Sequence, residues 1–96
     1  MKTITLSGSM RFQREMMEIA YFLEAKEGNC VLSCVYAPEG ESITEEDLRR
    51  LSQAHFRKIR LSDCLYVVNI NGYIGQTTKE EIKYARALGK EILYHI

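Results

Sequence analysis

The stretch NINGYIGQTTKEEIKYA, residues 69–85, decides the fold of this chain. An apolar run, residues 64–68, leads into it, and apolar residues at helical spacing, Ile82, Ala85 and Leu88, follow its polar part. A short apolar run bounded by a glycine-bearing loop is typical of a strand covered on both faces, as in a parallel sheet. The stretch therefore predicts a buried strand, a polar loop and a helix, in that order.

The rest of the chain repeats this alternation. We predict strands over residues 3–7, 30–36, 64–70 and 91–96. We predict helices from Phe12 to a stop at Gly28, from an N-cap at Thr44 to about Arg60, and from about Thr77 to Leu88. Strands that alternate with helices form parallel sheets with right-handed crossovers. The sequence therefore predicts one α/β domain over residues 1–96, a flavodoxin/Rossmann-like three-layer sandwich with a four-stranded parallel sheet in the order 2-1-3-4.

The composition argues against two classes of partner. The chain is 46% hydrophobic, and its 13 basic and 13 acidic residues cancel, whereas a nucleic-acid-binding surface usually shows a basic excess. The uncharged apolar stretches fall far short of the ~20 residues of a membrane span, and the N-terminus starts with strand-like residues and not with a signal peptide. We therefore expect a cytoplasmic protein with neither a nucleic-acid polymer nor a membrane as partner.

The three cysteines, Cys30, Cys34 and Cys64, stand at no metal-ligand spacing and lie in apolar, strand-like segments. Free cysteine is among the residues most often buried. We expect all three to be reduced core residues, and we expect neither a metal nor another cofactor.

In a sheet of this order, ligands bind beyond the carboxyl ends of the strands, where the strand order reverses. That point lies between the first and third strands, and the loops there are residues 7–11 and 69–78. In the first loop, Gly8 lets the backbone approach a ligand, and Ser9 precedes a helix N-terminus suited to anions or sugar hydroxyls. The same residues also fit a tight turn that needs a glycine. Arg11 either pairs with a 5'-phosphate or is a surface residue.

The second loop supplies further candidates for substrate binding. Asn69 either bonds a sugar hydroxyl or caps the loop backbone, and Tyr73 either stacks on a base or packs on its own loop. Gly72 and Gly75 either approach the ligand or permit turn conformations with positive φ. Thr77, at the start of the predicted helix, completes this set.

Two glutamates follow the loop, and each matches a capping box, Thr77 with Glu80 and Thr78 with Glu81. Glu81 lies on the edge of the apolar stripe of the helix, whereas Glu80 lies on a more solvated face. The helix dipole keeps a carboxylate in the first turn ionised. Beside a sugar-binding loop, such a carboxylate is a competent nucleophile toward an anomeric carbon. We therefore expect Glu81 to face Gly8 across the sheet edge.

The segments ITLSGSMRF, residues 4–12, and LSDCLYVVNINGYIGQTTKEEIKYARALGK, residues 61–90, resemble the nucleoside 2-deoxyribosyltransferase family. That family includes small deoxynucleoside 5'-monophosphate glycosidases. The resemblance covers nearly the whole chain in element order and is most specific over residues 63–90. It implies that Glu81 attacks C1' of a small-molecule nucleoside or nucleotide and forms a glycosyl-enzyme intermediate. It also implies a homodimer or a higher homo-oligomer.

The chain departs from the family at three places. His55 stands where the transferases carry a supporting aspartate, Gly75 stands where they carry an acidic loop residue, and the chain stops at Ile96, before the usual extension. His55 is either a packed histidine or a general acid that protonates the departing base. On an unbroken helix from Thr44 it is roughly 16 Å along, which we expect to be deep below the carboxyl edge.

The resulting hypothesis is N-glycoside cleavage or glycosyl transfer through a glycosyl ester on Glu81. The alternative is a non-catalytic nucleotide-binding module of the same fold.

Overall fold

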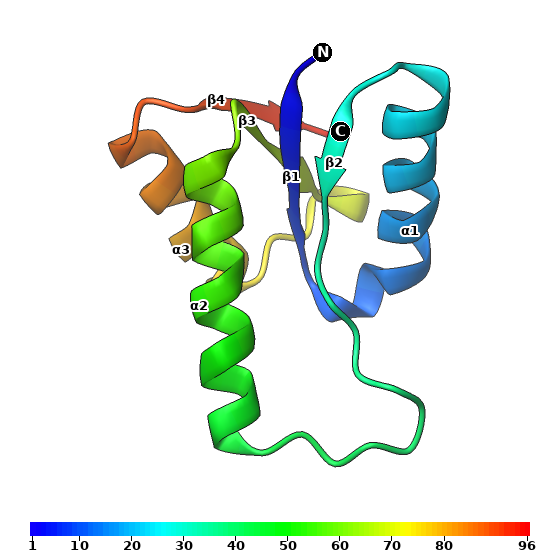
Figure 1. Cartoon of the computed structure of the whole chain (residues 1–96), viewed down its shortest axis with the longest axis vertical. Helices are drawn as coiled ribbons and strands as arrows, with labels where there is room; N and C mark the ends of the chain where they lie inside the picture. The colour runs from blue at the N-terminus through cyan, green and yellow to red at the C-terminus, as the bar shows by residue number, and fades with distance from the viewer.

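The computed structural model describes residues 1–96, the whole chain. Four strands alternate with three main helices (Figure 1). Their bounds are β1 Thr3–Gly8, α1 Gln13–Tyr21, β2 Cys30–Leu32, α2 Glu45–Leu61, β3 Cys64–Val68, α3 Gln76–Ala87 and β4 Glu91–Tyr94. A 3-10 turn, Met10–Phe12, leads into α1, a π-helical turn, Phe22–Lys26, continues it, and a second 3-10 turn, Ile70–Gly72, follows β3.

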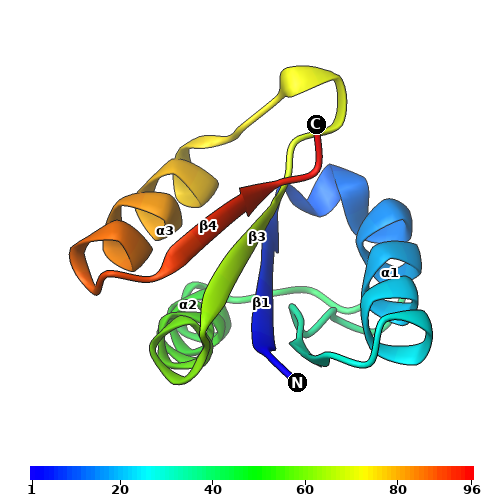
Figure 2. The same ribbon diagram turned by 90° about the horizontal axis from the view of Figure 1, so that it is seen from above.

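The predicted sheet is confirmed. All strand pairs are parallel and the order is β2-β1-β3-β4, with Ile4 opposite Cys64 and Gly8 opposite Val68 in the central pair. Figure 2 shows α1 on one face of the sheet and α2 and α3 on the other. The fold is therefore the three-layer α/β sandwich that the alternation of strands and helices predicts.

The two faces of the sheet carry separate hydrophobic cores, because successive side chains of a strand point to opposite faces. On β3, Cys64 and Val68 pack toward α1, and Leu65 and Val67 pack toward α2 and α3. The first core also holds Ile4, Leu6, Phe12, Met16 and Leu23, and the second holds Ile59, Ile82 and Ala85.

Three strands are shorter than predicted. β2 ends at Leu32 instead of residue 36, β3 at Val68 instead of residue 70, and β4 at Tyr94 instead of residue 96. β2 pairs with only the first three residues of β1. Immediately after it, the carbonyl of Ser33 accepts a hydrogen bond of 2.7 Å from Lys58 Nζ on α2. Where the chain leaves the sheet, the Lys58 side chain therefore replaces the neighbouring strand as the hydrogen-bond partner of the Ser33 carbonyl.

α2 is the element that shapes the carboxyl edge. Its predicted N-cap is confirmed, since Thr44 and Asp47 form a reciprocal capping box with bonds of 3.0 and 3.1 Å. The helix then runs unbroken to Leu61, antiparallel to the strands, and its first turns project beyond the end of β1 (Figure 1). This overhang gives the carboxyl edge of the sheet a side wall. None of the helices has the length and apolar character needed to cross a membrane.

Candidate functional site

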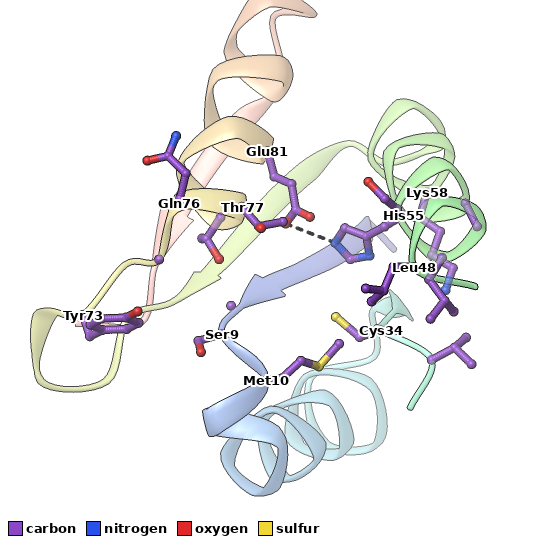
Figure 3. A pocket seen from close by; sticks show the side chains of 17 residues that line it. Ser9, Met10, Cys34, Leu48, His55, Lys58, Tyr73, Gln76, Thr77 and Glu81 are labelled. Carbon is purple, nitrogen blue, oxygen red and sulfur yellow. Dashed lines mark ion pairs between the residues drawn. The ribbon is translucent and has the colours of Figure 1, made fainter. Parts of the chain in front are cut away.

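A pocket of about 410 Å³ opens at the carboxyl edge of β1, between the N-terminal part of α3 and the overhang of α2 (Figure 3). One side of it is apolar and the other is polar. The side along α2 and the segment after β2 is mostly apolar, with Cys34, Val35, Leu48 and Leu51 beside His55 and Lys58, and the side along α3 is polar, with Gln76, Thr77, Thr78 and Glu81 (Figure 3). It lies where the strand order reverses, as expected for an open α/β sheet.

Glu81 is the only carboxylate among the lining residues. It is 6% exposed. Its Oε1 accepts a hydrogen bond from Ser7 Oγ and lies 3.4 Å from His55 Nε2. Its Oε2 makes no hydrogen bond and is not sealed from solvent. The carboxylate is therefore held by one oxygen and free at the other.

Neither glutamate caps α3, so the capping alternative for their spacing is wrong. α3 begins at Gln76, one residue earlier than predicted, and its N-cap, Gly75, makes no side-chain cap bond. Glu81 consequently lies in the second turn and not in the first, so the first turn holds no acidic residue. Glu80 is exposed, and Thr78 is buried against the pocket.

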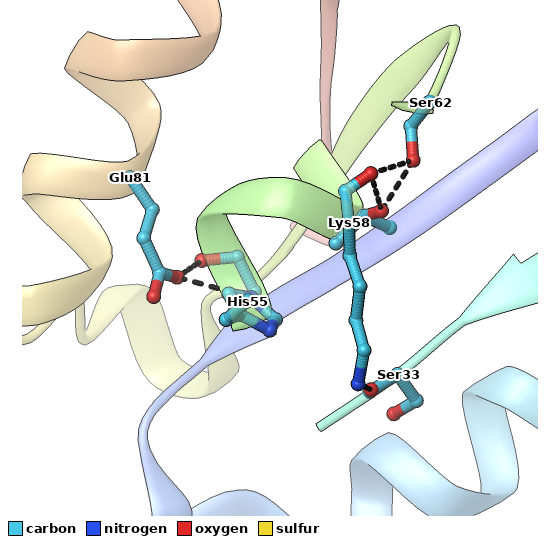
Figure 4. Close-up of polar contacts among 7 residues, drawn as sticks. Ser33, His55, Lys58, Ser62 and Glu81 are labelled. Atoms are coloured by element: carbon cyan, nitrogen blue, oxygen red, sulfur yellow. Dashed lines mark hydrogen bonds and ion pairs between the residues drawn. The ribbon is translucent and has the colours of Figure 1, made fainter. Parts of the chain in front are cut away.

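His55 reaches the site, contrary to the expectation that it lies too deep. α2 starts well beyond the sheet edge, so roughly 16 Å along the helix is the level of the carboxyl end of β1, not a level far below it. The ring is 7% exposed and its Nε2 is buried with no hydrogen-bond partner. Figures 3 and 4 show it directed at Glu81.

Ser7 is the residue of this candidate site that sequence reasoning missed. It ends the strand segment TITLS, it is fully buried, and its hydroxyl donates to Glu81. Thr5 points to the same face, where its hydroxyl bonds Ser62 and the carbonyl of Lys58. Two hydroxyls at alternate positions of a central strand were the available signal, because a buried hydroxyl requires a partner.

Cys34 is half-buried: it packs against the first hydrophobic core, and it also lines the pocket, which was not predicted. Burial raises the pKa of its thiol to about 11, and the nearby charge of Glu81 adds to the shift while that of Lys58 opposes it. The thiol is therefore neutral near pH 7. Cys30 is half-buried, Cys64 is buried, and all three cysteines are free. No group of three or more metal-ligating side chains is close enough to hold a metal ion.

Five of the predicted binding residues line the pocket. One of them is Gly8, where an added Cβ would lie 3.1 Å from Met16 Sδ and from Val68 Cβ, so a larger residue would fit only if these neighbours shifted by a few tenths of an ångström. The remaining four are Ser9, Tyr73, Gly75 and Thr77.

Three predicted residues lie outside the pocket lining. The Asn69 side chain bonds the backbone of Ile96 and so ties the chain end to β3. Gly72 occupies an exposed turn with φ +78°, which explains the glycine without a ligand. The guanidinium of Arg11 lies 3.9 Å from the centre of the Tyr73 ring. It therefore stacks on Tyr73 and does not line the pocket.

Comparison with known proteins identifies the fold and nothing finer. No family model matches the chain, and no curated protein matches it significantly. A crystal structure of a conserved protein from Enterococcus faecalis V583 is similar, with a TM-score of 0.65 and 15% sequence identity over 98% of this chain and 62% of that chain. The chain thus spans about three fifths of the length of that protein. At this identity the likeness shows the α/β fold alone.

Proposed function

We propose that the protein cleaves or transfers the N-glycosidic bond of a nucleoside or nucleoside monophosphate, with Glu81 as nucleophile. The observation that carries the proposal is the state of the Glu81 carboxylate. It is buried at the polar side of a pocket, one oxygen is held by Ser7, and the other is free. A carboxylate in that state is an activated nucleophile when a reactive carbon is brought against it.

The chemistry balances with the groups present. A free carboxylate oxygen attacks C1', the bond from C1' to the base nitrogen breaks, and its electron pair leaves with the base. A proton from the His55 imidazolium, or from water, neutralises the departing base. In the second step the oxygen of water, or the nitrogen of a second base, attacks C1' and releases the Glu81 carboxylate. The proton of that nucleophile passes to His55 or to water.

The shape of the pocket supports a nucleoside over a smaller sugar. About 410 Å³ is within the usual range for small-molecule sites. The side formed by Val35, Leu48 and Leu51 offers an apolar surface to a base, and the opposite side offers Ser9 and Thr77 to sugar hydroxyls. Glu81 lies on the polar side, where the sugar would be placed.

A non-catalytic nucleotide-binding module is the second candidate. Glycosidases with two carboxylates use one as nucleophile and the other as acid, whereas this pocket contains Glu81 alone. If neither His55 nor water supplies the proton, the site binds its ligand without turnover.

Intact-protein mass spectrometry after incubation with 2'-fluoro-2'-deoxynucleosides tests the proposal. The fluorine slows both steps, so a competent nucleophile accumulates as a sugar adduct on Glu81. We expect that adduct in the wild-type protein and none in Glu81→Gln, with Glu80→Gln as the exposed control. A thermal shift with neither adduct nor base release would support the binding module and reject the enzyme.

A further inference from the structure

We infer that Ser7 is the positioning residue of this site, and that it makes Oε2 of Glu81 the oxygen presented to a ligand. The inference rests on the proposed function for its catalytic part, but its geometric part stands on the contacts of Ser7 and Glu81 alone.

Ser7 is placed more rigidly than the carboxylate it contacts. Its backbone is opposite Val67 in the parallel ladder between β1 and β3, and the residue is fully buried. The hydroxyl oxygen of Ser7 is placed by one rotatable side-chain bond, whereas the carboxylate oxygens of Glu81 are placed by three. The hydroxyl therefore occupies a point fixed by the sheet, and the flexible side chain is anchored to that point.

The hydrogen bond from Ser7 is the only one that the Glu81 carboxylate accepts. His55 Nε2 lies 3.4 Å from the same Oε1 but makes no hydrogen bond. Both neighbours therefore crowd Oε1, and Oε2 is left without a partner. The two oxygens of one carboxylate are thereby given different roles, Oε1 as the anchored atom and Oε2 as the reacting atom.

Thr5 shows that a buried hydroxyl on this face of β1 need not serve the pocket. It lies two residues before Ser7 on the same face and is equally buried. Its hydroxyl forms hydrogen bonds with Ser62 Oγ and with the carbonyl of Lys58, at the C-terminal end of α2. Figure 4 shows the Lys58 and Ser62 contacts. Lys58 also lines the pocket, but Thr5 contacts only its main-chain carbonyl and makes no contact with Glu81 or His55, so Thr5 is a control for the loss of a buried hydroxyl.

The test compares Ser7→Ala with Thr5→Ala in crystal structures of the ligand-free protein and in steady-state kinetics. We expect Glu81 in Ser7→Ala to adopt more than one side-chain conformer or to turn Oε1 away from β1. We expect kcat to fall roughly 10- to 100-fold with KM within about twofold, since the lost contact orients a reacting group and does not bind substrate. Ser7→Cys, which retains a weak donor, should recover part of the loss. Thr5→Ala should lower the melting temperature but leave Glu81 and kcat unchanged.

The outcomes separate this inference from the proposed function. Glu81 in one unchanged conformer in Ser7→Ala overturns the inference, whether or not the protein turns over a nucleoside. Displacement of Glu81 in Ser7→Ala, with a wild-type protein that releases no base, supports the positioning role and rejects the enzyme. Equal losses of kcat in Ser7→Ala and Thr5→Ala would reduce Ser7 to a packing residue. Should Ser7→Ala fail to fold, Ser7→Cys carries the same comparison, because it keeps the shape of the side chain and leaves no cavity, although sulfur is larger than oxygen.

Discussion

The side-chain amide of Asn69 makes two hydrogen bonds with the backbone of Ile96. Its Oδ1 accepts from the Ile96 amide at 2.9 Å, and its Nδ2 donates to the Ile96 carbonyl at 3.2 Å. The last residue of the chain is thus tied to the end of β3, one residue before the turn that leads toward the pocket. Asn69, which its place at the end of β3 made a candidate for ligand binding, is instead a structural clamp that joins β3 to Ile96.

We expect Asn69→Ala to destabilise the protein by about 1–3 kcal/mol, because it removes two hydrogen bonds that contribute about 0.5–1.5 kcal/mol each. The loss should appear in urea unfolding, and amide exchange should rise in β4 before it rises in β1. Asn71→Gly is the control, since Asn71 has φ +54° and a glycine accepts that conformation at no cost. Unaltered exchange in β4 would contradict the clamp.

Glu81→Gln should keep the affinity for a nucleoside and lose nearly all turnover. The amide is almost isosteric, but a neutral amide cannot form the glycosyl ester. Isothermal titration and a base-release assay measure the two effects separately, and Glu80→Gln serves as the exposed control. Turnover retained by Glu81→Gln would remove Glu81 from the chemistry.

His55→Ala separates a proton donor from a packed ring. As a donor, its loss should cut base release by roughly 10²–10⁴-fold with the fold intact. Nucleosides whose base already carries a positive charge, such as 7-methylguanine nucleosides, should be spared, because that base leaves as a neutral molecule without a proton. If the ring is only packed, the variant loses a few kcal/mol of stability, and both substrate classes react at the wild-type rate.

The strand order and layers of the fold could be predicted, although three strands end earlier than expected, whereas the site could be predicted only in part. Strand order and helix layers followed from the alternation of strand-like and helical spacing of apolar residues along the sequence. That spacing reflects which side chains are buried and depends little on the exact contacts. The position of His55 was wrong because it depends on how far α2 overhangs the sheet, a distance that the long connection from Leu32 to Glu45 sets. Ser7 was missed because its partner, Glu81, is distant in sequence and only the packing of β1 against α3 joins them.

Cys34 should make the stability of the protein depend on alkaline pH. The folded-state pKa of its thiol, about 11, lies above the ordinary value of 9.0 for a free thiol. As pH rises from 9 to 11, the unfolded chain loses this proton first, so folding stability falls. The full effect is about 2–3 kcal/mol. Urea unfolding at pH 7.5 and 10.5 should show a smaller drop for Cys34→Ala than for the wild type, and equal drops would count against the buried thiol.

We expect the protein to be a homodimer or a multiple of one. A domain of this size has a small core, and Met17, Tyr21 and Phe22 of the α1 layer are each more than half exposed. Light scattering at micromolar concentration should give at least twice the chain mass of 11.1 kDa. Met17→Lys should shift the mass toward the monomer if α1 forms the contact. A wild-type mass of one chain would contradict association.

The central place of β1 in the sheet has a consequence for how the protein folds. β1 is the first strand to be synthesised, yet it pairs with β2 on one side and with β3, which ends at Val68, on the other. For parallel strands joined by such long connections to pair, the chain must lose loop-closure entropy before the strand contacts form and stabilise it. This slows folding. On the ribosome, β1 must therefore wait with an unpaired edge until β3 has emerged. Ser7 can meet Glu81 only after α3 follows, so the pocket is among the last features of the molecule to form.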